Sequence, residues 1–197
     1  MDSLSQQVLQ FGYARLSLLA RWGAKDTEQL VASLFAEHRE PMFRYLTLIT
    51  RNPAISEELV QETFLRLHRE FNAGVKFDNV RAWLYRVAHH LALDHGKQTK
   101  QTGSLSSEIL SDSVEERFAS ETQNPEEMAI DRQRWKLLDE AVSNLPAIQR
   151  QCLYLRREGF GYRKIALILD IGETTVVDHL RRAIQRLQKE LHVQRPG

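Results

Sequence analysis

The sequence lacks the features that would place the chain in a membrane or in an oxidising compartment. Its 197 residues include a single cysteine, Cys152, which excludes an intramolecular disulfide. No stretch approaches the ~18 consecutive apolar residues that a membrane-spanning helix needs. Residues 1–23 have an acid at position 2 and arginines within their apolar part, so they match a signal peptide poorly. We therefore expect a cytoplasmic protein without stable membrane insertion, in which residues 1–25 form an N-terminal extension, either frayed or a short docking helix.

An overall charge bias is also missing, because 27 basic residues balance 26 acidic ones. The balance conceals three regions of different charge. Residues 1–98 contain 12 basic and 11 acidic side chains, residues 99–130 contain 2 and 7, and residues 131–197 contain 13 and 8. An acidic spacer thus separates two parts of the chain, and the clearest positive excess lies in the C-terminal part.

Alternating strand patterns and internal repeats are absent, whereas apolar residues recur at helical spacing in most of the chain. The pattern predicts a helix from residue 28 to the turn at residues 52–53, and another over about 55–71. We expect Pro41 to break or kink the first, because proline lacks an amide proton and clashes with the preceding turn. A further helix is expected to begin after Asp78 or Asn79, either of which is suited to cap it.

Residues 99–126 differ from the rest in being rich in serine, threonine and acidic side chains and poor in apolar ones. Such a segment cannot offset its ordering entropy by burial, so we interpret it as a flexible acidic linker. The sequence therefore predicts an all-α protein with two small helical domains, residues 26–98 and 127–197, joined by this linker.

Residues 159–190 are the most informative segment of the chain. Ile165, Ala166 and Leu169 predict the inner face of a short helix that ends in a tight turn. A longer basic helix follows, with an apolar stripe formed by Val176, Leu180, Ala183, Ile184 and Leu187. Two helices joined in this way make a helix-turn-helix, whose second helix enters the major groove. We therefore expect this end of the chain to bind DNA.

The outer face of that second helix supplies the candidate DNA contacts. The candidates for base edges are Thr174, Thr175, Asp178 and His179. The candidates for phosphates are Arg181, Arg182 and Arg186. Val177 is suited to contact a thymine methyl group, and partial burial is the alternative.

Both halves of the chain resemble the extracytoplasmic-function (ECF) sigma factors of the sigma-70 family. The family's promoter-melting domain, sigma region 2, resembles EELVQETFLRLHREF at 57–71 and FDNVRAWLYRVAHHLALDH at 77–95. Its C-terminal domain, region 4, resembles LPAIQRQCLYLRREGFGYRKIALILDIGETTVVDHLRRAIQRLQKEL at 145–191. The resemblance implies a bacterial protein, not an enzyme and without cofactor or metal. It would bind core RNA polymerase, recognise the −10 and −35 promoter elements, and promote transcription initiation.

The resemblance also implies functional residues in the first domain. The surface that docks the polymerase would include or adjoin Glu58, Gln61, Phe64 and Leu65, although the residues alone fit a solvated helix face equally well. The −10 element and its melted strand would meet Asn72, Lys76, Phe77, Asp78, Asn79, Arg81, Tyr85, Arg86, His89 and His90. Of the aromatic side chains, Phe77 and Tyr85 are expected to stack on bases and Trp83 to lie in the core. Family members often have Arg-Asn in place of His89-His90, which puts the base preference of this chain in doubt.

The partners implied by the resemblance are core RNA polymerase, promoter DNA as duplex and as melted non-template strand, and an anti-sigma factor. The acidic linker would thread a basic channel of the polymerase, or would act as a solvated tether. Either role suits its composition.

Two other functions remain open from the residues alone. A polymerase-independent helix-turn-helix regulator would read two half-sites as a dimer, but no heptad seam stands out. A metal-dependent hydrolase would use His90 and Asp94, which share a helix face, with His95 nearby. The sequence offers no second cluster of histidine and carboxylate for such a site.

Overall fold

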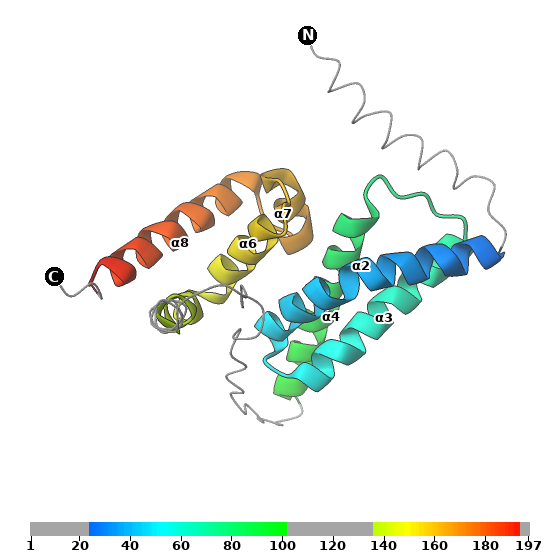
Figure 1. The fold of residues 1–197 in the computed structure, drawn as a ribbon, viewed down its shortest axis with the longest axis horizontal. Helices are drawn as coiled ribbons and strands as arrows, with labels where there is room; N and C mark the ends of the chain where they lie inside the picture. Colours follow the sequence, from blue (N-terminus) through cyan, green and yellow to red (C-terminus); the bar gives the residue numbers. More distant parts are fainter. Residues whose placement is uncertain (1–23, 102–135, 194–197) are drawn as a thin grey trace, which may run out of the picture.

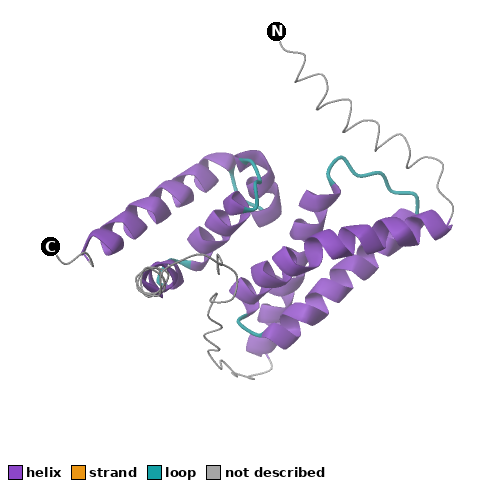
Figure 2. Cartoon of the chain, viewed as in Figure 1, coloured by secondary structure: helices purple, strands orange, loops and turns teal. Residues whose placement is uncertain are grey.

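The computed structural model describes residues 24–101 and 136–193, and all regular structure within these ranges is helical (Figure 1, Figure 2). The first range holds α2 (Ala24–Thr50), α3 (Pro53–Asn72) and α4 (Val80–Gln101). The second range holds a helix over 136–143, α6 (Ala147–Arg157), α7 (Tyr162–Leu169) and α8 (Glu173–Val193). The all-α prediction is confirmed. Residues 1–23 of the predicted extension and 102–126 of the predicted linker lie outside the described residues.

Helix α2 continues through Pro41, so the break that the sequence predicted there is absent. Proline removes a single backbone hydrogen bond, and the packing of a helix can compensate for that loss. Here Met42, Tyr45 and Leu46 follow the proline directly and are fully buried. Their burial holds the helix in place across the proline.

Helix α3 has clear signals at both ends. Asn52 Oδ1 accepts hydrogen bonds from the amides of Ala54 (3.0 Å) and Ile55 (3.2 Å), so Asn52 caps the helix. At the other end Gly74 has a φ of 77°, and the next amide, that of Val75, donates to the Glu70 carbonyl (3.0 Å). This Schellman ending turns the chain into the loop that leads to α4, drawn in teal in Figure 2.

Asn79, rather than Asp78, caps the start of α4. Its Oδ1 accepts a hydrogen bond from the Ala82 amide at 2.7 Å. The helix continues to Gln101, three residues beyond the predicted domain boundary at residue 98. Helices α2, α3 and α4 enclose a core whose buried members are Met42, Leu46, Val60, Phe64, Leu67, Leu84, Ala88 and Ala92.

A second core joins the two halves of the chain. Tyr45 of α2 and Ala82 and Tyr85 of α4 belong to the same buried cluster as Cys152 and Leu155 of α6. The cluster also contains Phe160, Ile165, Ile168, Leu169, Val176 and Leu180. Helix α7 therefore packs on α4, and α6 packs on α2. The sequence predicted two domains but not this contact between them.

The helix-turn-helix is confirmed as α7 and α8. The inner face of α7 is made by Ile165, Ile168 and Leu169, whereas Ala166 is only partly buried and Ile168 was not predicted. On α8 the residues Val176, Leu180 and Ala183 are buried as predicted. Ile184 is 48% exposed, so its predicted place in the apolar stripe is wrong. At about 100° per residue it lies about 80° around the helix from Val176, outside the face that α6 and α7 cover.

Candidate nucleic-acid and polymerase interfaces

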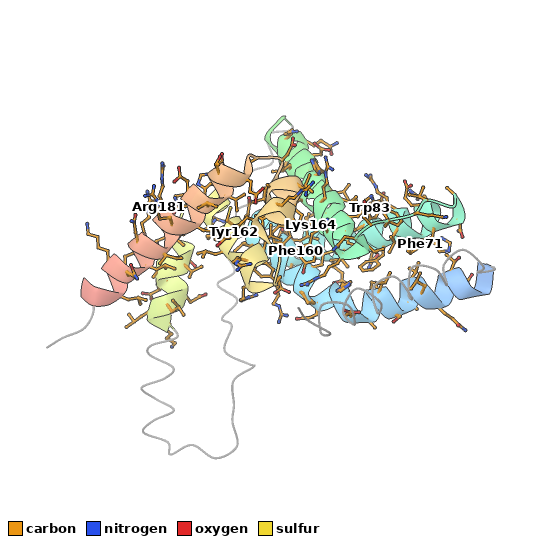
Figure 3. The ribbon with its side chains drawn as sticks, turned by 90° about the horizontal axis from the view of Figure 1, so that it is seen from above. Phe71, Trp83, Phe160, Tyr162, Lys164 and Arg181 are labelled. Carbon is orange, nitrogen blue, oxygen red and sulfur yellow. The ribbon has the colours of Figure 1, made fainter. Side chains whose placement is uncertain are left out.

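The turn between α3 and α4 gathers three aromatic rings. The Phe77 ring centroid lies 5.4 Å from that of Phe71 and 5.0 Å from that of Trp83, with edge-to-face geometry in both pairs. Figure 3 shows Phe71 and Trp83 at the same end of the molecule. All three side chains are partly buried against the first core, as expected for Trp83. Phe77, a predicted stacking residue, is therefore partly exposed and partly packed.

Polar residues from the predicted −10 set surround these rings. Four of them are exposed on the loop or its edges: Asn72, Lys76, Asp78 and Asn79. The Asn79 carboxamide oxygen is engaged in capping α4, so the cap limits its freedom to bind a base. The other three side chains face solvent beside the aromatic cluster. The loop thus combines stacking surface with hydrogen-bonding groups, as a site for unpaired bases requires.

Helix α4 divides the remaining members of the set between two faces. Arg86 is exposed and His90 half-buried, and His90 Nδ1 lies 2.7 Å from the Arg86 carbonyl. Tyr85 and His89, in contrast, are 0% and 3% exposed. Their burial differs from the expectation that both face a DNA strand. Tyr85 lies in the core that the two halves of the chain share, and His89 contacts Tyr45 of the same core.

The covered face has altered electrostatics. His89 Nδ1 lies 3.1 Å from the Tyr45 hydroxyl. Burial, with a smaller contribution from His90, lowers the pKa of His89 to about 4. The imidazole is therefore neutral near pH 7 and adds no positive charge to α4 in this arrangement.

Three of the four predicted polymerase-docking residues share an exposed face of α3. Glu58, Gln61 and Leu65 are spaced by three and four residues, and Leu65 is 53% exposed. Phe64 differs, because it is 5% exposed and packs edge-to-face on Phe35 with centroids 5.0 Å apart. Phe64 therefore belongs to the core, and the candidate docking surface consists of Glu58, Gln61 and Leu65.

The outer face of α8 presents the predicted −35 residues together. Exposed side chains are those of Thr174, Thr175, Val177, Arg181, Arg182 and Arg186. Val177 is 43% exposed, which favours the methyl-contact reading over burial. Asp178 is half-buried, and its carboxylate lies 2.9 Å from the Arg181 guanidinium and 3.8 Å from that of Arg182. His179 is half-buried as well.

The start of α7 adds basic residues that the sequence analysis did not select. Arg163 is exposed and Lys164 half-buried, and the Arg156 guanidinium lies over the Tyr162 ring at 5.1 Å from its centroid. Figure 3 shows Tyr162 and Lys164 between Arg181 on one side and Trp83 on the other. In a helix-turn-helix the first helix crosses the DNA backbone, so this position suits phosphate contacts. The basic Arg163-Lys164 pair was the available signal.

The residues proposed for a hydrolytic metal site are engaged differently. Asp94 pairs with Lys97 at 3.1 Å, and His90 contacts its own helix backbone. Within the described residues, no three histidine, cysteine or carboxylate side chains come together as metal ligands. In the same part of the chain, no helix is long and apolar enough to span a bilayer.

Comparison with known proteins finds two family models in the order of the two helical units. Residues 34–102 match the Sigma-70 region 2 model, and residues 135–187 match the Sigma-70, region 4 model. A similar protein is the ECF RNA polymerase sigma factor SigL of Mycobacterium tuberculosis, 31% identical over 169 residues. That alignment covers 82% of this chain and 89% of SigL. The ECF RNA polymerase sigma factor SigM of Bacillus subtilis is 24% identical, with 80% and 93% covered.

Two solved structures share the fold. The sigma factor RpoE of Bartonella quintana, in complex with the anti-sigma factor NepR, aligns with a TM-score of 0.61 and 21% identity. That alignment covers 87% of this chain and 99% of RpoE. CnrH, in complex with the cytosolic domain of CnrY, aligns with a TM-score of 0.59 and 16% identity over 91% and 99% of the two chains.

Proposed function

The chain belongs to the extracytoplasmic-function sigma factors of the sigma-70 family. We propose that separate surfaces of the chain carry out the separate steps of transcription initiation. The chain is a sigma factor that binds core RNA polymerase, directs it to promoters and promotes initiation. Sigma factors are transcription initiation factors and act without enzymatic activity of their own. The observation that carries the assignment is the order of the two units, a region 2 bundle followed by a region 4 helix-turn-helix.

The exposed face of α3 is the proposed polymerase-docking surface. Leu65 offers an apolar anchor that is 53% exposed, and Glu58 and Gln61 lie on the same face. Leu65 would form the apolar centre of the interface, and Glu58 and Gln61 would belong to its polar rim. Phe64 supports this surface from the core.

The loop between α3 and α4 is the proposed site for unpaired bases of the −10 element. Phe77 would stack on a base, while Asn72, Lys76 and Asp78 would contact its polar edge or its phosphate. Arg81, Tyr85 and His89 would extend the site along α4 once their face is uncovered. Arg86 is already exposed, and His90 is half-buried.

Helices α7 and α8 are the proposed reader of the −35 element. The second helix would enter the major groove with Thr174, Thr175 and Val177 at base edges. Its arginines and the Arg163-Lys164 pair would hold phosphates on either side.

We also propose a cytoplasmic location and an anti-sigma partner. Both solved neighbours carry such a partner or a cytosolic domain of a second protein in their complexes. The polymerase that this chain must reach is in the bacterial cytoplasm.

Direct binding to purified bacterial core RNA polymerase tests the proposal. We expect tight one-to-one binding, weakened at least about tenfold by Gln61→Ala with Leu65→Ala, as for hot-spot residues. Leu93→Ala is the matched control, because Leu93 is 41% exposed on α4, away from the docking face. An equal loss of polymerase affinity in the control would contradict the assignment of α3 as the docking surface. Absence of binding by the folded wild type would favour a polymerase-independent regulator.

A further inference from the structure

The turn that joins α6 to α7 lies on the same face of α4 that we assign to the melted strand. The Arg81 guanidinium donates a hydrogen bond to the Glu158 carbonyl and lies 3.4 Å from the Glu158 carboxylate. The same guanidinium lies 4.6 Å from the centroid of the Phe160 ring. The Phe160 ring also packs edge-to-face on Tyr85, with centroids 5.0 Å apart. Three groups of the turn therefore meet two side chains of α4.

Gly159 makes this arrangement possible. Its φ of 85° ends α6 in a Schellman motif, in which the Phe160 amide donates to the Leu155 carbonyl (3.1 Å). The reversal sends the Glu158 carbonyl and the Phe160 ring to the same side of the chain. Phe160 is 5% exposed, and Figure 3 shows it in the middle of the molecule.

The chemistry of the turn matches that of a nucleotide. A nucleotide in a single strand offers a flat ring for stacking and, a few ångströms away, anionic oxygens for a guanidinium. Phe160 supplies the ring, against Tyr85 and under Arg81. Glu158 supplies an anionic carboxylate and a neutral carbonyl oxygen, and both lie within reach of the Arg81 guanidinium. The turn and a DNA strand therefore cannot contact Arg81 and Tyr85 at the same time.

We propose that the Glu158–Phe160 turn is an intramolecular substitute for one nucleotide of the melted strand, and that it must leave α4 before the strand can bind. The inference rests on the proposed function of α4 in holding that strand. The chain thereby keeps its region 2 site closed with its own region 4. Other contacts support the closed form, including the hydrogen bond from the Tyr154 hydroxyl to the Pro41 carbonyl (2.6 Å).

The test uses the full chain and a fluorescein-labelled single-stranded DNA pool of mixed sequence. The variant is Glu158→Gln with Phe160→Leu, which removes the charge and the aromatic ring and keeps an apolar side chain. Glu190→Gln on α8 is the control for the loss of one negative charge. Loss of the cation–π, edge-to-face and ionic contacts together should raise the equilibrium constant for opening about tenfold. We expect the variant to bind the pool about tenfold more tightly, and the control to bind like wild type.

The lone buried thiol gives a second readout that needs no DNA. Cys152 is 0% exposed in the shared core, so its rate of modification by a thiol reagent rises when the two units separate. We expect faster modification in the variant, with thermal unfolding by circular dichroism confirming that it stays folded. If the double variant is unfolded, DNA affinity and the rate of Cys152 modification are measured instead for Glu158→Gln and for Phe160→Leu separately.

Each outcome bears on a different claim. If the folded variant binds DNA with unchanged affinity, the turn does not substitute for a nucleotide, even if Cys152 reacts faster. In the complex with core polymerase, Arg81→Ala measures the strand site itself. If Arg81→Ala abolishes strand binding in the complex, the proposed function of α4 is supported. If the turn variants also leave DNA binding by the free chain unchanged, the proposal that the turn substitutes for a nucleotide is wrong. No effect of Arg81→Ala in the complex removes the assignment of α4 instead.

Discussion

The Tyr45 hydroxyl lies 3.1 Å from His89 Nδ1, in a buried contact between α2 and α4 beneath the C-terminal unit. The Tyr45 ring also lies 5.5 Å, centroid to centroid, from that of Tyr154 of α6. The pair therefore sits where the two units meet. Because burial lowers the pKa of His89 to about 4, the contact depends on a neutral imidazole.

Acid is expected to open the contact between the units. A histidine whose pKa is about 4 when closed and about 6.5 when exposed binds protons better in the open form. The closed form is therefore fully favoured above pH 6.5 and loses up to about 2 kcal/mol between pH 7 and 5. Small-angle scattering should show a larger radius of gyration at pH 5 than at pH 7.

His89→Asn is the control for this pH dependence. The variant keeps a polar side chain that cannot titrate, so the change in radius of gyration between pH 7 and 5 should shrink. An unchanged pH profile would contradict the role of His89.

Neighbouring residues of α3 should separate folding from docking. Phe64→Ala removes a ring that is 5% exposed, and we expect a loss of about 3–5 kcal/mol of unfolding free energy. Leu65→Ala, at an exposed position, should cost less than about 0.5 kcal/mol. Chemical denaturation of both variants measures this, and similar losses would contradict the placement of the two side chains. Only Leu65→Ala should reduce polymerase affinity in a protein of wild-type stability.

The cap of α3 should contribute measurably to stability. Asn52→Ala removes an oxygen that accepts hydrogen bonds from two helix amides, so we expect a loss of about 1 kcal/mol. Asn144→Ala, at an exposed position, is the matched control and should be near neutral. Thermal unfolding compares the two, and an equal shift would contradict the capping role.

Arg182 is expected to contribute affinity for DNA without sequence preference. Its guanidinium is exposed on α8, 3.8 Å from the Asp178 carboxylate. Arg182→Ala should weaken all duplex sequences similarly and lower the slope of log affinity against log salt by about one unit. Fluorescence anisotropy at several salt concentrations measures both. A loss confined to one base position would identify Arg182 as a base contact instead.

Local patterns were sufficient to predict the helices and the helix-turn-helix. Periodicity identified most of the buried face of α8, and the turn at residues 52–53 marked a real helix boundary. Errors arose where neighbours in the fold decide burial. Ile184 fits an apolar stripe by spacing but extends beyond the helices that cover α8.

The contact between the units could not be predicted in this way. Tyr85 and His89 have the spacing and chemistry of a surface that binds a strand, and a nearby protein segment can satisfy the same chemistry. Only the fold places Phe160 against Tyr85, from 75 residues further along the chain. Phe64 was predicted at the docking surface but lies in the core, because the docking surface and the core share one helix.

Transcription by reconstituted polymerase is the decisive test of whether the chain acts as a sigma factor. Core enzyme, with and without the chain, would transcribe genomic DNA of the source bacterium, and the 5′ ends of the transcripts would be mapped. We expect new start sites that share two upstream elements and that disappear with Gln61→Ala plus Leu65→Ala. Identical start sites with and without the folded chain would contradict its role as a sigma factor.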